Sequence, residues 1–596
     1  MNKYELEKKH LSSIASSQQI SAASPDASVW VEASAGTGKT KVLSDRVLRL
    51  LLNDVQPSKI LCLTYTKAAA VEMNERIAKR LSSWVIIDET ELYKALLGLF
   101  GDDFNKYNKD EIMKKARTLF AQILDAPGGM RIQTIHSFCQ DILKRFPLEA
   151  NVSPYFEILD DRSSKNILQK IQSDLLKSID NDENLVLAQD VAFLVKSVSE
   201  FKFPEVMNMI TGNRNKIDIL LKQYADISLI TKELEKRLKV SVDLSPIEIK
   251  EDLFDKIDKK TFKLCMEAFF NGGKEDNKRA LSFALISQNN FNIEYYEEYK
   301  NVFLTKEGGK RANLARKDAI KHFPDILEIM KKEQDRVFEV ENTLKSINVL
   351  HSTLAILRIS KNIIDAYNDY KEHFCVLDYD DLILKTKYLL ENKDTSDWVL
   401  FKLDGGIEHI LIDEAQDTSP NQWAIVRALT EEFFAGLGAY ENQKNRSVFV
   451  VGDRKQSIYS FQGADPKEFD KMYNYFKQKS ADFLKIHLDV SFRSTKAIMD
   501  CVNTLFDTDI AKKGVIPDGE KINHCPYRLG DGGVFEISPI VKQIKDEDNA
   551  EISWHIPLER IQKSSPSSIL AKQIARNIKD MVQNKEILAS KNRPIQ

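Results

Sequence analysis

The sequence predicts an α/β fold built on a parallel β-sheet that is interrupted by a large helical segment. Short apolar runs at residues 29–31, 60–63, 410–412 and 448–451 have the length and composition of buried strands. A cluster of polar residues follows each run. Because ligands of open α/β sheets bind at the carboxyl ends of the strands, we expect these four clusters to meet at one crevice.

The composition is that of a globular protein with several domains. Of its 596 residues, 43% are hydrophobic and 29% are charged. The net charge of -3 does not exclude DNA as a partner, because a local basic groove is invisible in a global sum. The six cysteines form no C-x-x-C pair, and the N-terminus carries no apolar signal segment. We therefore expect a soluble cytoplasmic protein without a zinc site or disulfides.

The first polar cluster has the form of a phosphate-binding loop. The residues ASAGTGKT at 33–40 lie between an apolar run and a helical pattern at 41–52. Glycines let successive backbone N–H groups point at one anion, and the following helix presents its positive end. We expect Lys39 to reach the terminal phosphates of a nucleoside triphosphate and Thr40 to hold Mg²⁺. The candidate loop residues are Ala33, Ser34, Ala35, Gly36, Thr37, Gly38, Lys39 and Thr40, of which Ala33 replaces the usual first glycine.

Two adjacent carboxylates follow the apolar run at 410–412. Asp413 is expected to hold Mg²⁺, directly or through water, and Glu414 to polarise the water that attacks the γ-phosphate. The alternative is an acidic loop exposed to solvent after a strand. The phosphate loop in the same chain favours the catalytic interpretation.

The segment after the run at 448–451 combines an amide with two aromatic rings. Gln456 is suited to sense the γ-phosphate, and Tyr459 and Phe461 offer ring faces on which nucleic-acid bases stack. Such an arrangement would couple a nucleotide to a DNA strand. The alternative is a turn with two core aromatic residues, and this segment alone does not decide between the two.

Two further segments carry side chains suited to a strand of nucleic acid. Thr64 and Thr66 are short donors for phosphate oxygens, and Tyr65 between them offers a ring for stacking. His136 and Ser137 are similar donors farther along the chain. Neither segment decides by itself, since a histidine in such a place is more often structural.

A glycine-poor segment between residues 151 and 370 predicts a helical domain inserted into the α/β domain. Its apolar content is too high for a disordered linker. The alternative to a functional insertion is a purely structural one. One apolar stripe with helical spacing is formed by Leu344, Ile347, Leu350, Leu354, Leu357, Ile364 and Tyr367.

A second α/β domain is predicted to begin at Lys485. Arg493 follows its first strand and is suited to reach a γ-phosphate across a cleft between domains. The alternative is an ordinary surface ion pair. We expect a strand at 533–538 and a helix at 569–581, and the chain ends soon afterwards, so this domain is expected to be incomplete.

In this order, the motifs resemble those of the UvrD/Rep family of superfamily 1 DNA helicases. The phosphate loop is similar to motif I, and residues 63–73 and 134–139 match the TxTxKAAxEM and T-x-H-S-x-C patterns of the family. Residues 413–417, 452–465 and 489–495 resemble motifs II, III and IV, and Gln19 with Ala22 and Pro25 resembles the adenine-reading Q motif. The segments FPLEANVSP, LDYDDLI and DRKQSIYSFQGAD most resemble those of AddA-type helicase subunits, which act in double-strand-break repair.

The resemblance implies movement from 3' to 5' on single-stranded DNA, with ATP and Mg²⁺ as cofactors. By the same analogy Lys39, Asp413, Glu414, Gln456 and Arg493 form the catalytic set, and the insertion is an accessory domain, called 1B, that contacts duplex DNA. An AddB-type subunit is the expected partner. The expected parts are 1–155 and 371–484 as the two parts of RecA-like domain 1A, 156–370 as domain 1B, and 485–596 as the start of RecA-like domain 2A.

The sequence departs from the family pattern at two places. Phe461-Gln462-Gly463 stands where relatives commonly carry Trp-Arg-Gly, and nothing resembles motifs V and VI or a nuclease domain. We therefore expect the chain alone to bind ATP, hydrolyse it slowly and unwind DNA poorly, either as a fragment or with a separately encoded C-terminal half. The alternatives are an ATP-dependent DNA-binding module that does not unwind DNA and a phosphate-loop ATPase that acts on protein.

Overall fold

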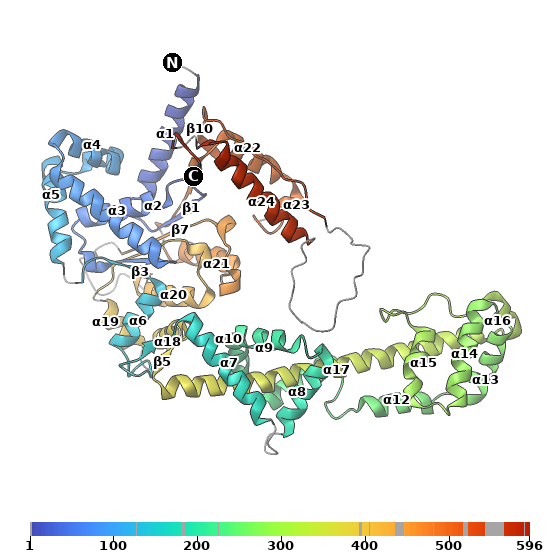
Figure 1. Ribbon diagram of the computed structural model, residues 1–596. Helices are drawn as coiled ribbons and strands as arrows, with labels where there is room; N and C mark the ends of the chain where they lie inside the picture. Colours follow the sequence, from blue (N-terminus) through green and yellow to red (C-terminus); the bar gives the residue numbers. More distant parts are fainter. Residues whose placement is uncertain are drawn as a thin grey trace. The chain divides into compact units, whose positions relative to one another are not determined.

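The computed structural model describes residues 3–126, 128–179, 185–224, 226–392, 396–404, 406–434, 446–480, 482–516, 522–542, 565–588 and 591–596 (Figure 1). The chain divides into two compact units. The first unit comprises Met1–Ile132, Ile407–Pro420 and Gly436–Gln596, and the second comprises Gln133–Gly406 and Asn421–Ala435.

A six-stranded sheet lies at the centre of the first unit, with the strand order β3-β2-β6-β7-β1-β8. The β2–β6, β6–β7, β7–β1 and β1–β8 pairs are all parallel. The four strands predicted from apolar runs are confirmed, and they are β1, β2, β6 and β7. The strand bounds are β1 (Val29–Ala33), β2 (Ile60–Thr64), β3 (Arg131–Thr134), β6 (His409–Ile412), β7 (Ser447–Gly452) and β8 (Leu484–Leu488).

Helices cover both faces of this sheet. Val29 and Val31 pack into a hydrophobic cluster with the helices that follow β1 and β2, whereas the Trp30 ring lies 4.6 Å from that of Phe469 on α21. Successive side chains of a strand point to opposite faces, so β1 contacts both layers, as a buried parallel strand does. The helices of this unit include α1 (Lys3–Ala22), α2 (Lys39–Leu52), α3 (Lys67–Ile86), α4 (Glu89–Phe100), α5 (Lys109–Asp125) and α21 (Pro466–Lys479).

The second α/β domain does not begin at Lys485. The strand that was expected to open it, β8, instead pairs with β1 and forms an edge of the first sheet. Leu484 is exposed and only Leu488 is buried in β8, so its sequence does not reveal which sheet it joins. The next strand, β9 (Val490–Thr495), lies outside that sheet and pairs in parallel with β10 (Cys525–Arg528).

The C-terminal segment confirms one predicted element and corrects another. The helix expected at 569–581 is present as α24 (Pro566–Gln583). The prediction of a strand at 533–538 is wrong, because these residues have no regular structure and are exposed. The exposed fraction of the side chain is 82% for Val534 and 81% for Ile537. A β-rich sequence forms a strand only where a neighbouring strand offers hydrogen bonds. The remaining elements are α22 (Lys496–Leu505), α23 (Asp509–Lys512), β11 (Ile587–Leu588) and β12 (Arg593–Pro594).

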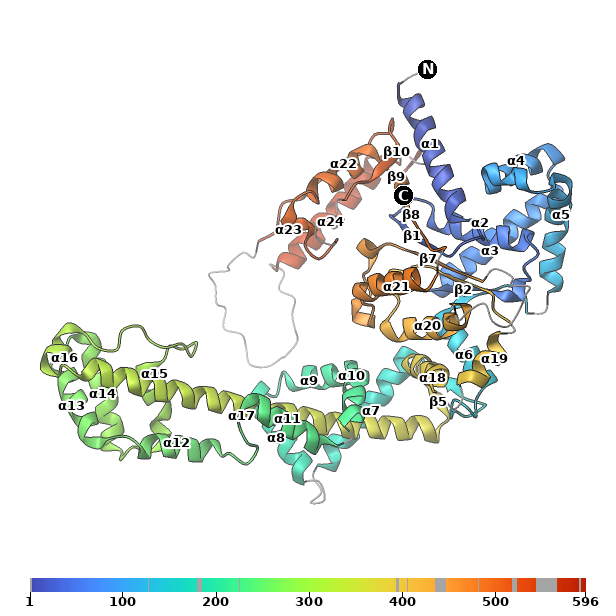
Figure 2. The same ribbon diagram turned by 180° about the vertical axis from the view of Figure 1, so that it is seen from behind.

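The second unit is organised by one long helix, α17 (Ile326–His373), which has 48 residues (Figure 2). The shorter helices pack along it, and the predicted apolar stripe is confirmed as its inner side. Leu350, Leu354 and Tyr367 are at most 2% exposed. The other helices are α6 (Ile135–Arg145), α7 (Asp161–Ser178), α8 (Leu185–Val198), α9 (Phe203–Gly212), α10 (Arg214–Tyr224), α11 (Ile227–Leu238), α12 (Pro246–Asp255), α13 (Lys259–Phe270), α14 (Lys274–Gln288), α15 (Tyr296–Phe303), α16 (Lys317–His322), α18 (Tyr379–Glu391), α19 (Ser396–Asp404) and α20 (Pro420–Phe434).

The second unit extends beyond the insertion expected at 156–370. It also includes α6, α18, α19 and nearly all of α20. The apolar side of α6 is buried, and α6 and α18 pack against each other within this unit. A two-stranded parallel pair, β4 (Glu157–Ile158) with β5 (Val376–Leu377), joins the two ends of the insertion.

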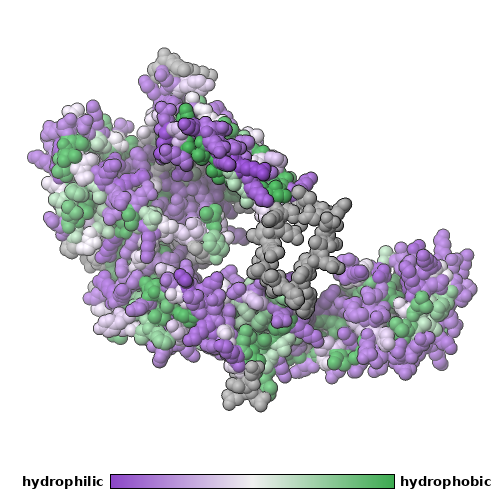
Figure 3. Space-filling model, viewed as in Figure 1, coloured by the Kyte–Doolittle hydropathy of each residue, from purple (hydrophilic) through white to green (hydrophobic). Residues whose placement is uncertain are grey.

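The surface is mostly hydrophilic on the side seen in Figure 3, where hydrophobic residues gather only in small groups. Among the helices that the structure describes, none combines the length and the apolar composition needed to cross a lipid bilayer. Even α17 carries charged residues from Glu328 to Lys345 and again from Arg358 to Glu372.

A buried histidine joins two central strands. His409 on β6 is 3% exposed, and its Nδ1 lies 2.8 Å from the Ser447 hydroxyl on β7. That hydroxyl accepts a hydrogen bond of 2.9 Å from Arg46, so its own proton is free to point at Nδ1 of a neutral imidazole. Burial, together with the nearby positive charges of Arg46 and Lys59, lowers the pKa of His409 to about 3.

This histidine predicts a loss of stability in mild acid. Because its pKa is lowered by folding, its contribution is complete above the unfolded pKa of about 6.5 and is lost progressively as the pH falls below that value. We expect the free energy of unfolding to decrease by about 2 kcal/mol between pH 7 and pH 5 through this residue alone.

Denaturant unfolding of His409→Asn at both pH values measures this contribution, with the exposed His10→Asn as the matched control. The His409 variant should lose the acid-dependent part, and the control should keep it. Equal pH dependence in both variants would contradict the assignment.

Candidate nucleotide-binding site

The predicted phosphate loop joins β1 to α2 in a conformation that depends on its glycines. Gly36 and Gly38 have φ angles of 79° and 97°, and Gly38 is the N-cap of α2. The Thr37 hydroxyl donates a hydrogen bond of 2.8 Å to the Ser34 carbonyl and closes the loop. The N–H groups of the first turn of α2 have no helical partner, so they are available to an anion.

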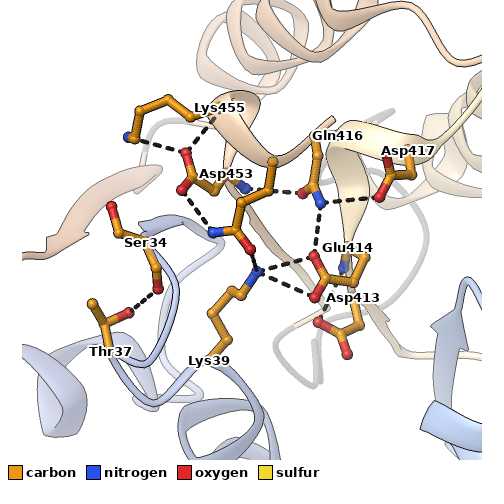
Figure 4. A network of polar contacts seen from close by, with 10 residues as sticks. Ser34, Thr37, Lys39, Asp413, Glu414, Gln416, Asp417, Asp453 and Lys455 are labelled. Carbon is orange, nitrogen blue, oxygen red and sulfur yellow. Dashed lines mark hydrogen bonds and ion pairs between the residues drawn. The ribbon is translucent and has the colours of Figure 1, made fainter. Parts of the chain in front are cut away.

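Two of the other predicted catalytic side chains contact Lys39. Its Nζ lies 3.0 Å and 3.1 Å from the two carboxylate oxygens of Glu414 and 3.2 Å from Oε1 of Gln456 (Figure 4). Lys39 and Glu414 are 375 residues apart in sequence. The sheet brings them together because β1 and β6 flank β7, and all three strands end at the same edge.

Asp413 and Glu414 lie directly after β6. Glu414 adopts a left-handed backbone conformation, with φ 50° and ψ 44°, and its N–H donates to Oδ1 of Asp413 at 3.0 Å. For a residue with a Cβ this conformation costs about 1 kcal/mol, and such strain often occurs at functional sites. It turns Glu414 toward Lys39.

The residues at this edge fit a bound Mg²⁺. Burial and the negative charge of Glu414 raise the pKa of Asp413 to about 6, and Lys39 only partly opposes this effect. A divalent cation would stabilise the ionised carboxylate. Among the described residues, no group of three or more His, Cys, Asp or Glu side chains would bind a metal unaided. The roles of Asp413 and Thr40 as Mg²⁺ ligands stay a prediction.

Residues that the sequence analysis did not single out complete the network. Gln456 donates from Nε2 to Asp453 at 2.7 Å, and Lys455 forms an ion pair with the same carboxylate at 3.0 Å. Gln416 donates from Nε2 to Glu414 at 2.7 Å. In the sequence, Gln416 is marked only by its position beside the two carboxylates, within the stretch 413–417 that resembles motif II.

Arg493 lies beside the phosphate loop but outside the cluster around Lys39. The backbone of β9 contacts the loop, since Phe492 N–H donates to the Gly36 carbonyl at 2.8 Å and the Ser491 hydroxyl to the Ala35 carbonyl at 3.1 Å. The Arg493 side chain is exposed. In the described part of the chain it forms no hydrogen bond or ion pair with Lys39, so its predicted role stays a prediction.

Gln19, the predicted adenine reader, is held against the phosphate loop. Its Nε2 donates to the Thr37 carbonyl at 3.1 Å, and its Oε1 accepts from Lys41 at 2.7 Å.

Two fully buried arginines of α2 hold the end of α1 in place. Arg46 donates to the carbonyls of Ala22, Ser24 and Ala27, and Arg49 donates to that of Ile20 and pairs with Asp103.

The aromatic residues proposed for base stacking form a continuous group in the first unit. The Tyr65 and Tyr459 rings lie 4.6 Å apart, and the Tyr459 and Phe461 rings lie 5.7 Å apart. Phe461 is 77% exposed. The side chain of Gln462 lies outside the described residues.

The hydroxyls of Thr64 and Thr66 have local partners. Thr64 donates to the Thr66 carbonyl at 3.0 Å, and Thr66 caps α3 by accepting from Ala69 N–H at 3.1 Å. These bonds shape the turn that presents Tyr65. Contacts of the two threonines with DNA stay a prediction.

His136 and Ser137 belong to the second unit, at the start of α6. The Ser137 hydroxyl lies 2.9 Å from that of Thr134, the N-cap of α6. The His136 ring packs edge-on against Tyr379 at 5.5 Å, and burial lowers its pKa. Both side chains therefore have structural partners, and their contact with DNA also stays a prediction.

The parallel sheet, with its polar cluster at the carboxyl edge, defines a RecA-type domain of the kind found in DNA helicases. The model of the UvrD/REP helicase N-terminal domain matches residues 14–477. The chain belongs to this family.

Several curated relatives are named as the A-type subunits of an ATP-dependent helicase/nuclease. The chain is 25% identical to that of Clostridium botulinum, with 96% of this chain and 46% of the relative aligned. It is 26% identical to that of Lactobacillus acidophilus, over 87% and 43% of the two chains. It is 27% identical to that of Listeria innocua, over 95% and 45%. The chain thus spans a little under half the length of these relatives.

Gly36 offers a test of the loop geometry. A Cβ at this position would lie 2.4 Å from Cβ of Arg493, and the φ angle of 79° already disfavours any side chain. We expect Gly36→Ala to displace the loop and to weaken binding of a fluorescent ATP analogue about tenfold or more, corresponding to 1.4 kcal/mol or more.

Gly98→Ala in α4 is the matched control, because a Cβ there meets no atom within 4 Å. It should bind the analogue as the unsubstituted chain does and unfold at the same or a slightly higher temperature. Unchanged binding by the Gly36 variant would refute the described loop conformation.

Proposed function

We propose that this chain is the ATP-driven motor portion of a DNA helicase that moves from 3' to 5' on single-stranded DNA during double-strand-break repair. The observation that carries the proposal is the meeting of Lys39, Glu414 and Gln456 at the carboxyl edge of the sheet. The rings of Tyr65 and Tyr459 lie in the same unit. Membership of the UvrD/REP family supports the choice of DNA as the second ligand.

In this proposal the phosphate loop binds the triphosphate of ATP through its N–H groups, and Gln19 reads the adenine. Thr40 and Asp413 would hold Mg²⁺, which when bound would neutralise charge on the phosphates. Lys39 exchanges its contact with Glu414 for one with the γ-phosphate. Glu414 then loses its ion pair, so its carboxylate is free to take the proton of the attacking water.

Gln456 and Arg493 are proposed to stabilise charge on the γ-phosphate in the transition state. Gln456 already contacts Lys39, whereas Arg493 requires a movement of its side chain toward the loop. A group that reaches the site only on closure would link hydrolysis to motion of the segment after β8.

The proposed DNA path uses ring faces and short polar groups. Tyr65, Tyr459 and Phe461 would stack on bases, since stacking tolerates any base sequence. His136 and Ser137, with Thr64 and Thr66, would contact the backbone, and the helical insertion would contact duplex DNA. Because the relatives are named as subunits, we propose an AddB-type partner as well.

Replacement of Glu414 tests the motor interpretation. We expect Glu414→Gln to bind ATP and single-stranded DNA within about threefold of the unsubstituted chain. Hydrolysis in single-turnover experiments with excess protein should slow by about 100-fold or more, because general-base catalysis contributes two to four powers of ten. Glu431→Gln on α20 is the matched control, since Glu431 is exposed.

Two outcomes would contradict the proposal. An unsubstituted chain that binds neither ATP nor DNA has no motor site. A Glu414 variant with an unchanged rate would favour a nucleotide-dependent binding module.

The aromatic group predicts a sequence-independent contribution to DNA binding. Tyr459→Ala should weaken binding of an oligo-dT strand by about 5- to 150-fold, which corresponds to the 1–3 kcal/mol of one stacked base. Fluorescence anisotropy over a range of salt concentrations measures this effect. Tyr388→Phe, on an exposed residue of α18, is the control. Equal affinity of the Tyr459 variant and the control would exclude this DNA path.

A further inference from the structure

We infer that Gln416 is the positioning residue that couples the nucleotide site to the aromatic DNA platform formed by Tyr65, Tyr459 and Phe461. This inference rests on the proposed function and assigns its internal communication to one side chain. Gln416 is 1% exposed. It lies in the short helical turn Ala415–Asp417 that follows β6.

On the nucleotide side, Gln416 contacts the proposed general base. Its Nε2 donates to Oε2 of Glu414 at 2.7 Å, and Glu414 pairs with Lys39 at 3.0 Å (Figure 4). The hydrogen-bond partners of Glu414 thus include both the residue expected to move to the γ-phosphate and the Gln416 amide. If Lys39 moves away from Glu414, the carboxylate that accepts the Gln416 hydrogen bond is no longer neutralised by an ion pair.

Gln416 also holds the segment after β7. Its Oε1 accepts from Asp453 N–H at 2.9 Å, and its own carbonyl accepts from the Ser457 hydroxyl at 3.1 Å. Asp453 in turn accepts from Gln456 at 2.7 Å. Gln416 therefore joins the two segments that carry the proposed base and the proposed γ-phosphate sensor.

On the DNA side, Gln416 reaches the segment that carries Tyr459 through Ser457, and it also contacts Asp417. Its Nε2 also donates to Oδ2 of Asp417 at 3.1 Å. Ser457, whose hydroxyl donates to the Gln416 carbonyl, lies two residues before Tyr459. Burial and the negative charge of Asp417 raise the pKa of Tyr65 to about 12.

The Gln416 amide has little room to move without changing its contacts with neighbouring residues. A Cβ on Gly452 would lie 2.6 Å from its Oε1, so the end of β7 packs directly against the amide. The amide of Gln416 has two N–H donors, and two carboxylates share them. When Lys39 leaves Glu414, the carboxylate of Glu414 keeps fewer hydrogen-bond donors and binds the Gln416 amide more strongly. We expect the hydrogen bond from this amide to Asp417 to change as a result. The segment carrying Tyr459 is tied to Gln416 itself through the Ser457 hydroxyl.

A purely structural role would produce a different result from a coupling role. A buried amide that only satisfies its neighbours would, when replaced, destabilise the fold and weaken both ligands together. A coupling residue would leave each separate affinity nearly unchanged and abolish the effect of one ligand on the other. By thermodynamic linkage, this effect is the same factor measured in either direction.

The experiment uses the 596-residue chain, a fluorescent oligo-dT strand and the nonhydrolysable analogue AMP-PNP with Mg²⁺. The coupling factor is the ratio of the oligonucleotide Kd values without and with AMP-PNP. We expect a factor of about 5 or more in the unsubstituted chain. In Gln416→Met it should fall below about 2, and each separate Kd should change less than about threefold.

Gln478→Met, on an exposed position of α21, is the matched control and should keep the full factor. Gln416→Glu is the second variant if Gln416→Met does not fold, because it preserves shape and an acceptor for Asp453 N–H but removes both donors. It should lose the coupling as well.

Retention of the coupling factor in either folded Gln416 variant would overturn the inference, as would an unsubstituted chain that binds both ligands without coupling. A parallel loss of both affinities would also overturn it and assign Gln416 a structural role. Failure of the proposed function is distinguishable, because the unsubstituted chain would then bind neither AMP-PNP nor the oligonucleotide.

Discussion

The contact between Lys39 and Glu414 is the interaction on which the rest of this site depends. It joins a loop near the N-terminus to a turn more than 370 residues later, at 3.0 Å between charged atoms. The parallel sheet, with β7 between β6 and β1, brings these two segments to one edge. The large helical unit in the sequence between them leaves that strand order intact because it is inserted between β3 and β6.

Negative charge is concentrated at this edge and is only partly balanced. Asp413, Glu414, Asp417 and Asp453 lie on two neighbouring turns, where Lys39 and Lys455 pair with Glu414 and Asp453. Burial and the charge of Glu414 raise the pKa values of Asp413 and Asp417. This is the charge pattern that a magnesium–nucleotide complex would balance, and the neutral amide of Gln416 separates two of the carboxylates without adding charge.

Two buried arginines hold the end of α1, which carries Gln19, beside the phosphate loop. Arg46 and Arg49 donate hydrogen bonds to carbonyls at and just beyond the end of α1, where helical partners are lacking. These bonds connect the end of α1 to α2. The same helix begins at the phosphate loop, so Gln19 is positioned relative to the loop by one rigid element. Base recognition and phosphate binding would therefore respond to the same helix.

The sequence by itself determined the local elements. The phosphate loop, the turns that carry Asp413 and Gln456, the four central strands and the apolar stripe of α17 all follow from short-range patterns, because each depends on residues only a few positions apart. The tertiary structure decided which sheet β8 joins, that residues 533–538 form no strand, and that Gln416 links two turns. These features depend on partners that are distant in sequence, and backbone pairing or burial of an amide leaves no pattern within a single segment.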